Sequence, residues 1–436
     1  MLGILRNRTY RQLFAAQVIS LLGTGLMTVA LGLLAYDLAG DQAGAVLGTA
    51  LAIKMLAYVG VAPVAQAFAD RVPRRSLLVG LDLVRAGAAL LLPFVTEVWQ
   101  VYVLIFVLQS ASAGFTPTFQ ATIPDILPDE REYTQALSLS RIAYDIESLS
   151  SPMLAAALLT VIGFHDLFAG TAIGFLASAA LVLSVTLPVV SRGARRGIWD
   201  RTTRGLRIYL ATPRLRGLLA VNLTVAAASA MVIVNTVVIV QVQFDLGKVA
   251  VAWALAAFGG GSMIAAFALP SLLERMADRP VVLAGALLLS LGTAAGVLVP
   301  SYAWLLPLWL VLGLGWGMAQ TPAGRLLRRS AHPEDRAAVF AAQFALTHAC
   351  WLICYPLAGR VGAAAGLQPT FILMALIGFI GVLLALRIWP AQEAMDIAHE
   401  HPELSPDHPH LLAHSGEGRH RHIFVVDDLH RRWHHG

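Results

Sequence analysis

Long apolar runs recur along most of this chain, and they constrain its fold more than any other feature. Many runs reach about 20 residues, the length that a helix needs to cross the hydrocarbon core of a bilayer. The chain is 57% hydrophobic and 13% charged, whereas an average soluble domain carries about 25% charged residues. The alternation typical of lipid-facing barrel strands is absent, so helices are the spanning structure that remains. We therefore predict an all-α membrane protein with twelve transmembrane helices, which begin near Tyr10, Ala43, Ser76, Val98, Thr134, Leu167, Arg214, Val249, Pro280, Ala303, Ala337 and Pro369.

Arginines gather in every second loop between the apolar runs, and this pattern predicts the orientation in the membrane. Loops rich in Lys and Arg stay in the cytoplasm. The intervening loops carry Asp41, Glu97, Asp166 and Asp245 with little positive charge. An even number of spans then places both termini in the cytoplasm, and we expect the inner membrane of a bacterium. The net charge of +5 follows from this loop asymmetry, so we infer no nucleic-acid partner.

A repeated segment divides the membrane body into two parts. Residues 116–131, TPTFQATIPDILPDER, match residues 321–336, TPAGRLLRRSAHPEDR, at Thr, Pro, Pro and Arg positions. Transporters built from such repeats move one half against the other around a shared site. We predict two pseudo-symmetric six-helix halves, with the boundaries 1–188 (first half), 189–213 (cytoplasmic linker), 214–389 (second half) and 390–436 (cytoplasmic tail).

The loop after the second predicted span, QAFADRVPRRSLL from Gln66, resembles the signature loop of the major facilitator superfamily. The resemblance covers about residues 1–390 and implies the major facilitator fold. The loop departs from the usual pattern of the superfamily at Gln66 and Pro73, which replace glycines. The segment IPDILPDER from Ile123 is similar to one in bacterial drug and siderophore exporters of this superfamily. By this resemblance, the gating loop and the residues that brace it are Asp70, Arg71, Arg74, Arg75, Asp82 and Arg85.

Charged residues inside predicted spans are the first candidates for a transport site. Each such charge costs about 2.5 to 3.5 kcal/mol on insertion scales. The fifth span carries Arg141, Asp145 and Glu147, and Lys54 lies in the second. Arg141 and Asp145 are four residues apart, so they could form a structural ion pair on one helix face. Alternatively, Asp145 and Glu147 are proton-coupling carboxylates or cation ligands. Lys54 could pair with Asp37 or with a carboxylate of another helix, or it could be a displaceable charge.

Ten of the chain's 13 histidines lie in the tail, between acidic residues. Neutral imidazoles at short separations favour nickel, copper, zinc and cobalt over magnesium or calcium. The alternative is a solvated tail that is rich in histidine without binding metal. His348, Cys350 and Cys354 in the eleventh span could form a soft metal site, although buried free cysteine is often a small core hydrophobe. The predicted tail ligands are His399, His401, His408, His410, His414, His420, His422, His430, His434 and His435.

A membrane body of this type with a His-rich tail resembles the nickel-resistance exporters of proteobacteria. The resemblance implies a secondary exporter of a divalent transition metal, nickel or possibly cobalt, driven by proton entry through alternating access. We expect no obligatory cofactor and a monomer in lipid, with Ni, Co or Zn as substrate or tail ligand. No P-loop, nucleotide fingerprint or catalytic triad spacing is present, so we expect no enzyme. Two alternatives remain: a proton-coupled drug or siderophore exporter whose tail buffers metal, and a metal sensor on a transporter scaffold.

The topology can be tested with cysteines introduced into loops. We expect cysteines at Gly193 and Ser405 to react from the cytoplasmic side, because the arginine-rich loops face that side. Cysteines at Gly40 and Gly163 should react from the opposite side. Labelling with an impermeant maleimide in intact cells and in inverted vesicles measures both. Reaction at Ser405 from outside the cell would contradict the predicted topology.

Overall fold

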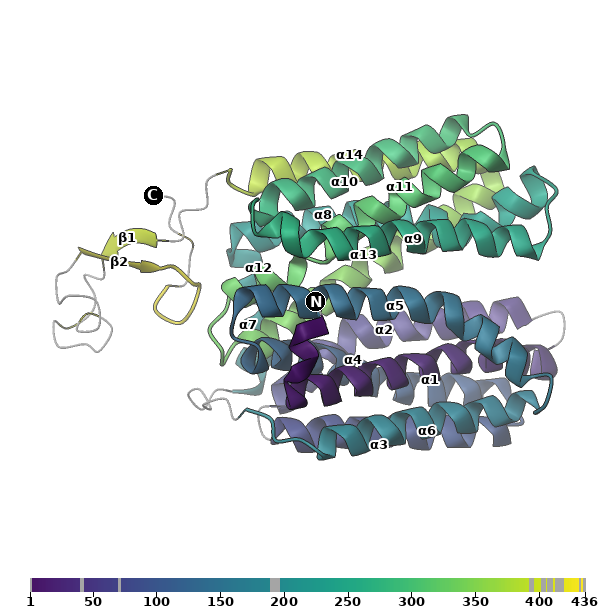
Figure 1. The fold of residues 1–436 in the computed structure, drawn as a ribbon, viewed down its shortest axis with the longest axis horizontal. Helices are drawn as coiled ribbons and strands as arrows, with labels where there is room; N and C mark the ends of the chain where they lie inside the picture. Colours follow the sequence, from purple (N-terminus) through teal and green to yellow (C-terminus); the bar gives the residue numbers. More distant parts are fainter. Residues whose placement is uncertain are drawn as a thin grey trace.

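The computed structural model describes residues 2–39, 43–69, 72–188, 197–391, 396–400, 405, 411, 419–430 and 433. Its long helices run side by side in two groups, one formed by the first half of the chain and one by the second (Figure 1). The tail projects from one end of this bundle. The first group contains α1 (Arg8–Ala39), α2 (Ala43–Ala69), α3 (Arg74–Leu91), α4 (Val98–Ile126), α5 (Glu130–Leu158) and α6 (Phe164–Leu183). The second contains α8 (Pro213–Val238), α9 (Lys248–Leu273), α10 (Asp278–Ala295), α11 (Tyr302–Gln320), α13 (Arg336–Ala365) and α14 (Leu367–Ile388).

The twelve helices of the bundle begin within a few residues of the predicted starts. The largest difference is at α5, which begins at Glu130 where Thr134 was expected. Among the described residues, 11 helices are long and apolar enough to cross a membrane. The helix α5 is equally long but carries Arg141, Asp145 and Glu147 in its middle. It therefore brings three charged residues into the apolar layer.

Glycines allow the helices of each half to approach closely. A Cβ added at Gly313 of α11 would lie 1.8 Å from the carbonyl oxygen of Phe258 in α9. One added at Gly261 of α9 would lie 1.9 Å from the carbonyl oxygen of Leu310. Small residues permit such backbone contact between membrane helices, which gain dispersion energy from it. Substitution of either glycine would force α9 and α11 apart.

The two halves are joined by ion pairs at one end of the bundle, which we call the arginine-rich end. Arg336, at the start of α13, lies 2.5 Å from Asp125 at the end of α4. Arg131, its repeat equivalent at the start of α5, lies 2.7 Å from Glu274 after α9. The two repeated arginines therefore make equivalent contacts: the arginine of each half pairs with a carboxylate of the other half.

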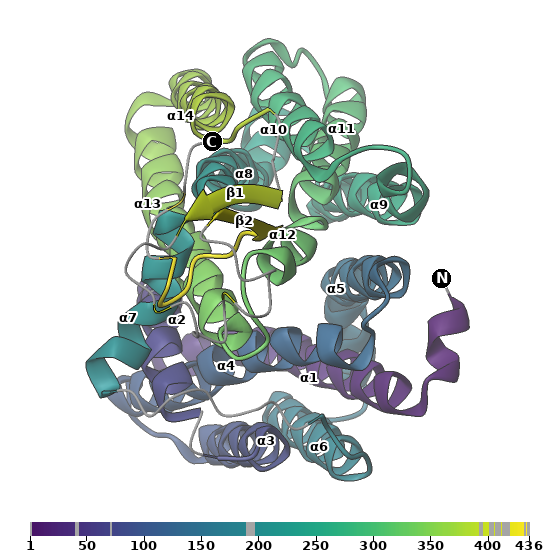
Figure 2. The same ribbon diagram turned by 90° about the vertical axis from the view of Figure 1, so that its left-hand side faces the viewer.

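Two features at the arginine-rich end were not predicted. The linker contains a helix, α7 (Ile198–Ala211), which packs against α13 and α2 and so contacts both halves. The tail contains an antiparallel hairpin of β1 (Asp396–Glu400) and β2 (Arg419–Ile423). Figure 2 looks onto this end and shows the hairpin and the short helix α12 (Ala323–Arg329) in front of the second half, with α7 at the edge beside α2. Hydropathy does not reveal such elements, because they are short and polar.

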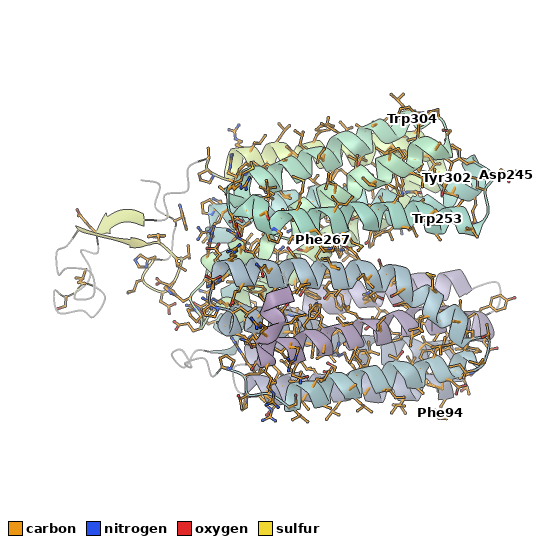
Figure 3. The ribbon with its side chains drawn as sticks, viewed as in Figure 1. Phe94, Asp245, Trp253, Phe267, Tyr302 and Trp304 are labelled. Carbon is orange, nitrogen blue, oxygen red and sulfur yellow. The ribbon has the colours of Figure 1, made fainter. Side chains whose placement is uncertain are left out.

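Exposed aromatic side chains lie at the opposite end of the bundle. Figure 3 shows Phe94, Trp253, Tyr302 and Trp304 there, far from the tail. Phe94 is 79% exposed, and Trp253 and Trp304 are each 65% exposed. Aromatic rings of this kind are enriched where a membrane protein crosses from lipid to water. Their placement agrees with helices that cross a bilayer along the long axis of the bundle.

Candidate functional site

An aromatic contact joins the two halves near the middle of the helices. The ring of Tyr58 in α2 lies 4.8 Å from the ring of Phe344 and 4.6 Å from that of His348, both in α13. The Tyr58 hydroxyl donates a 2.8 Å hydrogen bond to Gln109 of α4, which fixes the ring. The imidazole Nδ1 of His348 lies 2.7 Å from the carbonyl oxygen of Phe344. This cluster holds aromatic faces at the boundary between the halves.

The aromatic surface continues along α13. The ring of Trp351 lies 5.1 Å from His348, edge-on, and stacks on Tyr355 at 6.1 Å. Phe344, His348, Trp351 and Tyr355 follow the spacing of one helix face. Each is half-buried. The indole N–H groups of Trp351 and of Trp316 in α11 find no hydrogen-bond acceptor within the described part of the chain. Two indole N–H groups are therefore buried without an acceptor in this arrangement of the described helices.

Arg141 and Asp145 form the predicted ion pair. The Arg141 Nε lies 3.1 Å from one carboxylate oxygen of Asp145 and 3.2 Å from the other. Asp145 is only 3% exposed, and the Arg141 guanidinium also lies 3.6 Å from the ring centre of Trp316. The arginine thus compensates a buried charge and links α5 to α11 of the opposite half.

Glu147 lies on a different face of α5, toward α1 and α2. Its carboxylate accepts a 3.2 Å hydrogen bond from the Ser151 hydroxyl. Its carboxylate oxygen would lie 2.6 Å from a Cβ added at Gly25, so α1 packs closely here. Lys54 of α2 interacts electrostatically with Glu147, and its ammonium lies 5.6 Å from the Tyr58 ring centre. The partner of Lys54 is therefore Glu147, and the exposed Asp37 is not needed for this role.

The structure does not support a carboxylate pair formed by Asp145 and Glu147. The sequence analysis offered the two residues together as proton-coupling carboxylates or cation ligands. However, residues two apart on a helix point about 200° from each other. Asp145 is neutralised by Arg141, while Glu147 faces Lys54. Of these two carboxylates, Glu147 is the one that has no arginine partner among the described residues.

The proposed soft metal site in α13 is also not formed. Cys350 and Cys354 are 8% and 0% exposed and belong to the apolar core of the second half. His348 belongs to the opposite face and contacts Tyr58 of the first half. No group of three metal-ligating side chains occurs anywhere in the described ranges. The cysteines therefore act as small core residues.

The structure describes four of the six residues assigned to the gating loop and its bracing pair. Asp70 and Arg71 lie outside the described residues. Arg74 lies 2.6 Å from Asp125, and Arg75 donates to the carbonyl of Leu183. Asp82 and Arg85 form a buried pair within α3, where the Ser178 hydroxyl donates a 2.8 Å hydrogen bond to Asp82. This pair ties α3 to α6 and lies away from the boundary between the halves.

Most predicted metal ligands of the tail lie outside the described residues. In the hairpin, His399 is the register partner of His420, and His422 is the partner of Ile397. His430 is 3% exposed and contacts Phe424 and Asp427 of the tail, so it is buried and not presented to solvent. The tail ligands outside the described residues are His401, His408, His410, His414, His434 and His435.

The sequence analysis missed the aromatic residues and the buried arginine of the linker. Tyr58, Phe344 and Trp351 read as ordinary apolar residues within spans, and only their mutual contact distinguishes them. Arg204 was assigned to a polar loop, yet it is 7% exposed. Hydrogen bonds from its guanidinium to Asp335 and Asp428 raise its pKa, although burial lowers it. An amphipathic reading of Ile198–Ala211 could have found this helix.

Two helical halves, with charged and aromatic side chains where they meet, define a multi-pass membrane transporter and not an enzyme. The chain belongs to the Major Facilitator Superfamily, which it matches over residues 13–246 and 218–414. It is 26% identical to macrolide efflux protein A of Streptococcus pyogenes over 183 residues, 41% of this chain and 43% of that protein. The chain thus spans less than half of this relative. It is 27% identical to the multidrug efflux pump Tap of Mycobacterium tuberculosis over 317 residues, 70% of this chain and 74% of Tap.

Solved structures support the fold. The human organic anion transporter MFSD10 superposes with a TM-score of 0.76 at 14% identity, covering 87% of this chain and 99% of that one. A bacterial homologue of the iron transporter ferroportin, in an outward-facing state, superposes with a TM-score of 0.70 at 14% identity, covering 87% and 98%. At such low identity these likenesses concern the fold alone.

The Arg141–Asp145 pair is expected to stabilise the protein. Asp145→Asn should leave Arg141 uncompensated and lower the free energy of unfolding, by up to about 3 kcal/mol. The double variant Arg141→Gln/Asp145→Asn should recover part of the lost melting temperature, because it removes both charges. Asp37→Asn is the control, since Asp37 is an exposed carboxylate of α1. Thermal unfolding in detergent measures all variants, and an unchanged melting temperature for Asp145→Asn would refute the structural role.

Proposed function

We propose that this protein exports amphiphilic organic cations in exchange for protons. In this proposal the arginine-rich end faces the cytoplasm of a bacterial cell. The observation that carries it is the layer of aromatic rings beside Glu147 and Lys54, where the two halves meet. The relatives named as macrolide and multidrug efflux pumps support it.

The chemistry of this layer suits an organic cation. Aromatic faces such as Tyr58 and Trp351 attract cations through their ring quadrupoles. The unpartnered indole donors of Trp316 and Trp351 can bind an acceptor on the same compound. Glu147 supplies the negative charge, and retained charge inside a span is a default indication of function. A proton and an organic cation would then compete for one carboxylate, which couples their movements.

Glu147 should be essential for proton-driven export. With ethidium as the probe in inverted vesicles, Glu147→Gln should reduce export by about tenfold, the factor that a loss of about 1.4 kcal/mol produces. Asp37→Asn is the matched control, because Asp37 is an exposed carboxylate of α1. It should export normally. Full ethidium export by Glu147→Gln, with normal membrane insertion, would exclude Glu147 from coupling.

Export of nickel, or possibly cobalt, is the second candidate. It is favoured by the ten histidines of the tail and by the hairpin register that sets His399 opposite His420. The described part of the membrane body offers no group of three metal ligands to such an ion. Metal would therefore be collected by the tail, while its path through the bundle would rest on Glu147.

Removal of the tail tests the metal candidate. A chain that ends at Ala391 should insert, retain ethidium export, and lose more than one bound nickel ion per molecule. Equilibrium dialysis counts the ions, and nickel uptake by inverted vesicles tests transport. Nickel uptake driven by a proton gradient in the full chain would favour the second candidate. A truncated chain that binds as many ions as the full chain would eliminate the tail as a metal store.

A further inference from the structure

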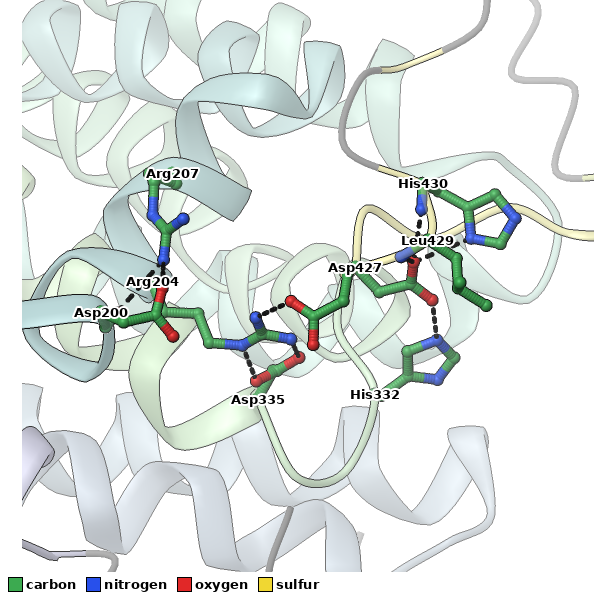
Figure 4. Close-up of polar contacts among 9 residues, drawn as sticks. Asp200, Arg204, Arg207, His332, Asp335, Asp427, Leu429 and His430 are labelled. Atoms are coloured by element: carbon green, nitrogen blue, oxygen red, sulfur yellow. Dashed lines mark hydrogen bonds and ion pairs between the residues drawn. The ribbon is translucent and has the colours of Figure 1, made fainter. Parts of the chain in front are cut away.

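We propose that the segment Phe424–His430, together with Trp433, is an intramolecular latch that holds the arginine-rich end of the bundle closed. This segment follows β2 directly and docks on the membrane body. Its contacts with α7 and with the loop before α13 are shown in Figure 4. The inference concerns regulation and does not depend on which compound the protein transports.

The docked segment is anchored by apolar burial. Phe424 is 0% exposed and Val426 is 4% exposed, and both belong to the core cluster that includes α8 and α13. The Phe424 ring lies 4.9 Å from His430 and 5.2 Å from Trp433. Trp433 in turn lies 5.4 Å from the guanidinium of Arg214, at the start of α8. An apolar segment buried in this way is part of the fold and not a solvated tail.

Charge complementarity fixes the position of the segment. Arg204 of α7 donates hydrogen bonds of 2.5 and 2.7 Å to Asp335, and one of 2.7 Å to Asp428 of the latch. Arg204 and Asp335 are buried, so the planar guanidinium is shared by one carboxylate from the body and one from the latch. The segment thereby fixes the linker helix to the second half.

A second polar contact holds the turn of the latch. Asp427 Oδ1 accepts hydrogen bonds from the backbone N–H groups of Leu429 and His430, at 2.9 and 2.7 Å, which stabilises the turn. Its other oxygen lies 3.4 Å from Nε2 of His332. The hydrogen bond with Asp427 raises the pKa of His332. The latch therefore contacts the loop before α13 directly at His332, and it is linked to Asp335 through the shared Arg204.

That loop lies between the residues that join the two halves. Before it, α12 supplies Arg325, which lies 2.8 Å from Glu130 of α5. After it, Arg336 lies 2.5 Å from Asp125 of α4. Opening of this end must break these pairs and move α7, because α7 packs against helices of both halves. A segment that binds the loop and α7 more tightly in the closed arrangement than in an open one stabilises the closed arrangement.

Cysteine accessibility tests the latch without any substrate. Ser138 of α5 is fully buried in the first turns below the arginine-rich end, so Ser138→Cys reports opening there. In full-length protein in nanodiscs, Asp428→Asn and Phe424→Ala should each increase maleimide labelling of this cysteine several-fold. Asp428 is exposed, so its variant is expected to fold. Asp200→Asn is the matched control: it removes an exposed carboxylate that pairs with Arg207 on the same helix α7, and labelling should not change.

A cross-link provides the opposite test. The variant that combines Ser138→Cys with His332→Cys and Asp427→Cys can be cross-linked by a short bifunctional thiol reagent. Cross-linking should slow maleimide labelling of the cysteine at position 138 below the rate in the Ser138→Cys variant alone. The reagent should leave this rate unchanged in variants that add only His332→Cys or only Asp427→Cys. Hydrogen exchange of residues 424–430 reports docking independently. Rapid exchange of this segment in the wild type would show that it does not dock. Loss of its protection in Asp428→Asn, with unchanged labelling at Ser138→Cys, would show that docking does not hold the end closed.

Discussion

The cost of charge in a medium of low dielectric constant governs this structure. Charges inside or beside the apolar layer are retained only where a partner compensates them. Asp145 is compensated by Arg141, and the buried Asp82 by Arg85. At the arginine-rich end, Asp125 serves both Arg74 and Arg336. One buried carboxylate, Asp125, thus holds both α3 and α13 in place. Of its two arginine partners, Arg336 belongs to the opposite half.

The internal repeat explains why the contacts between halves have this form. Arg131 and Arg336 occupy matching positions at the starts of α5 and α13. Each reaches a carboxylate at the end of a helix from the other half, Glu274 or Asp125. The Arg131–Glu274 pair is exposed and alone contributes little, about 0 to 1 kcal/mol, whereas the Arg336–Asp125 pair is largely buried. A set of modest pairs can separate cooperatively, which an alternating-access protein requires.

The helical body was predictable because its signals are local. Apolar runs bounded by Pro and charged residues give the helix positions, and the spacing of Arg141 and Asp145 gives their ion pair. The site was less predictable, because its geometry depends on contacts between distant residues. The four-residue helical spacing puts Cys350 beside Cys354, whereas His348 faces Tyr58 on another helix. The docked tail was missed because its contact with the bundle is non-local: Arg204 and Asp428 are 224 residues apart.

The docked segment changes what the histidine content of the tail means. The tail leaves the bundle after α14, where Trp389 is buried and its carbonyl accepts a hydrogen bond from Arg279. It returns to the bundle at Phe424. The stretch between them, which includes the hairpin of β1 and β2, is therefore attached to the bundle at both ends, and β2 passes into the latch without a linker. Tethering at two points raises the effective concentration of its side chains near the arginine-rich end. It also transmits any rearrangement of the loop to Arg204 and α7, and through α7 to both halves.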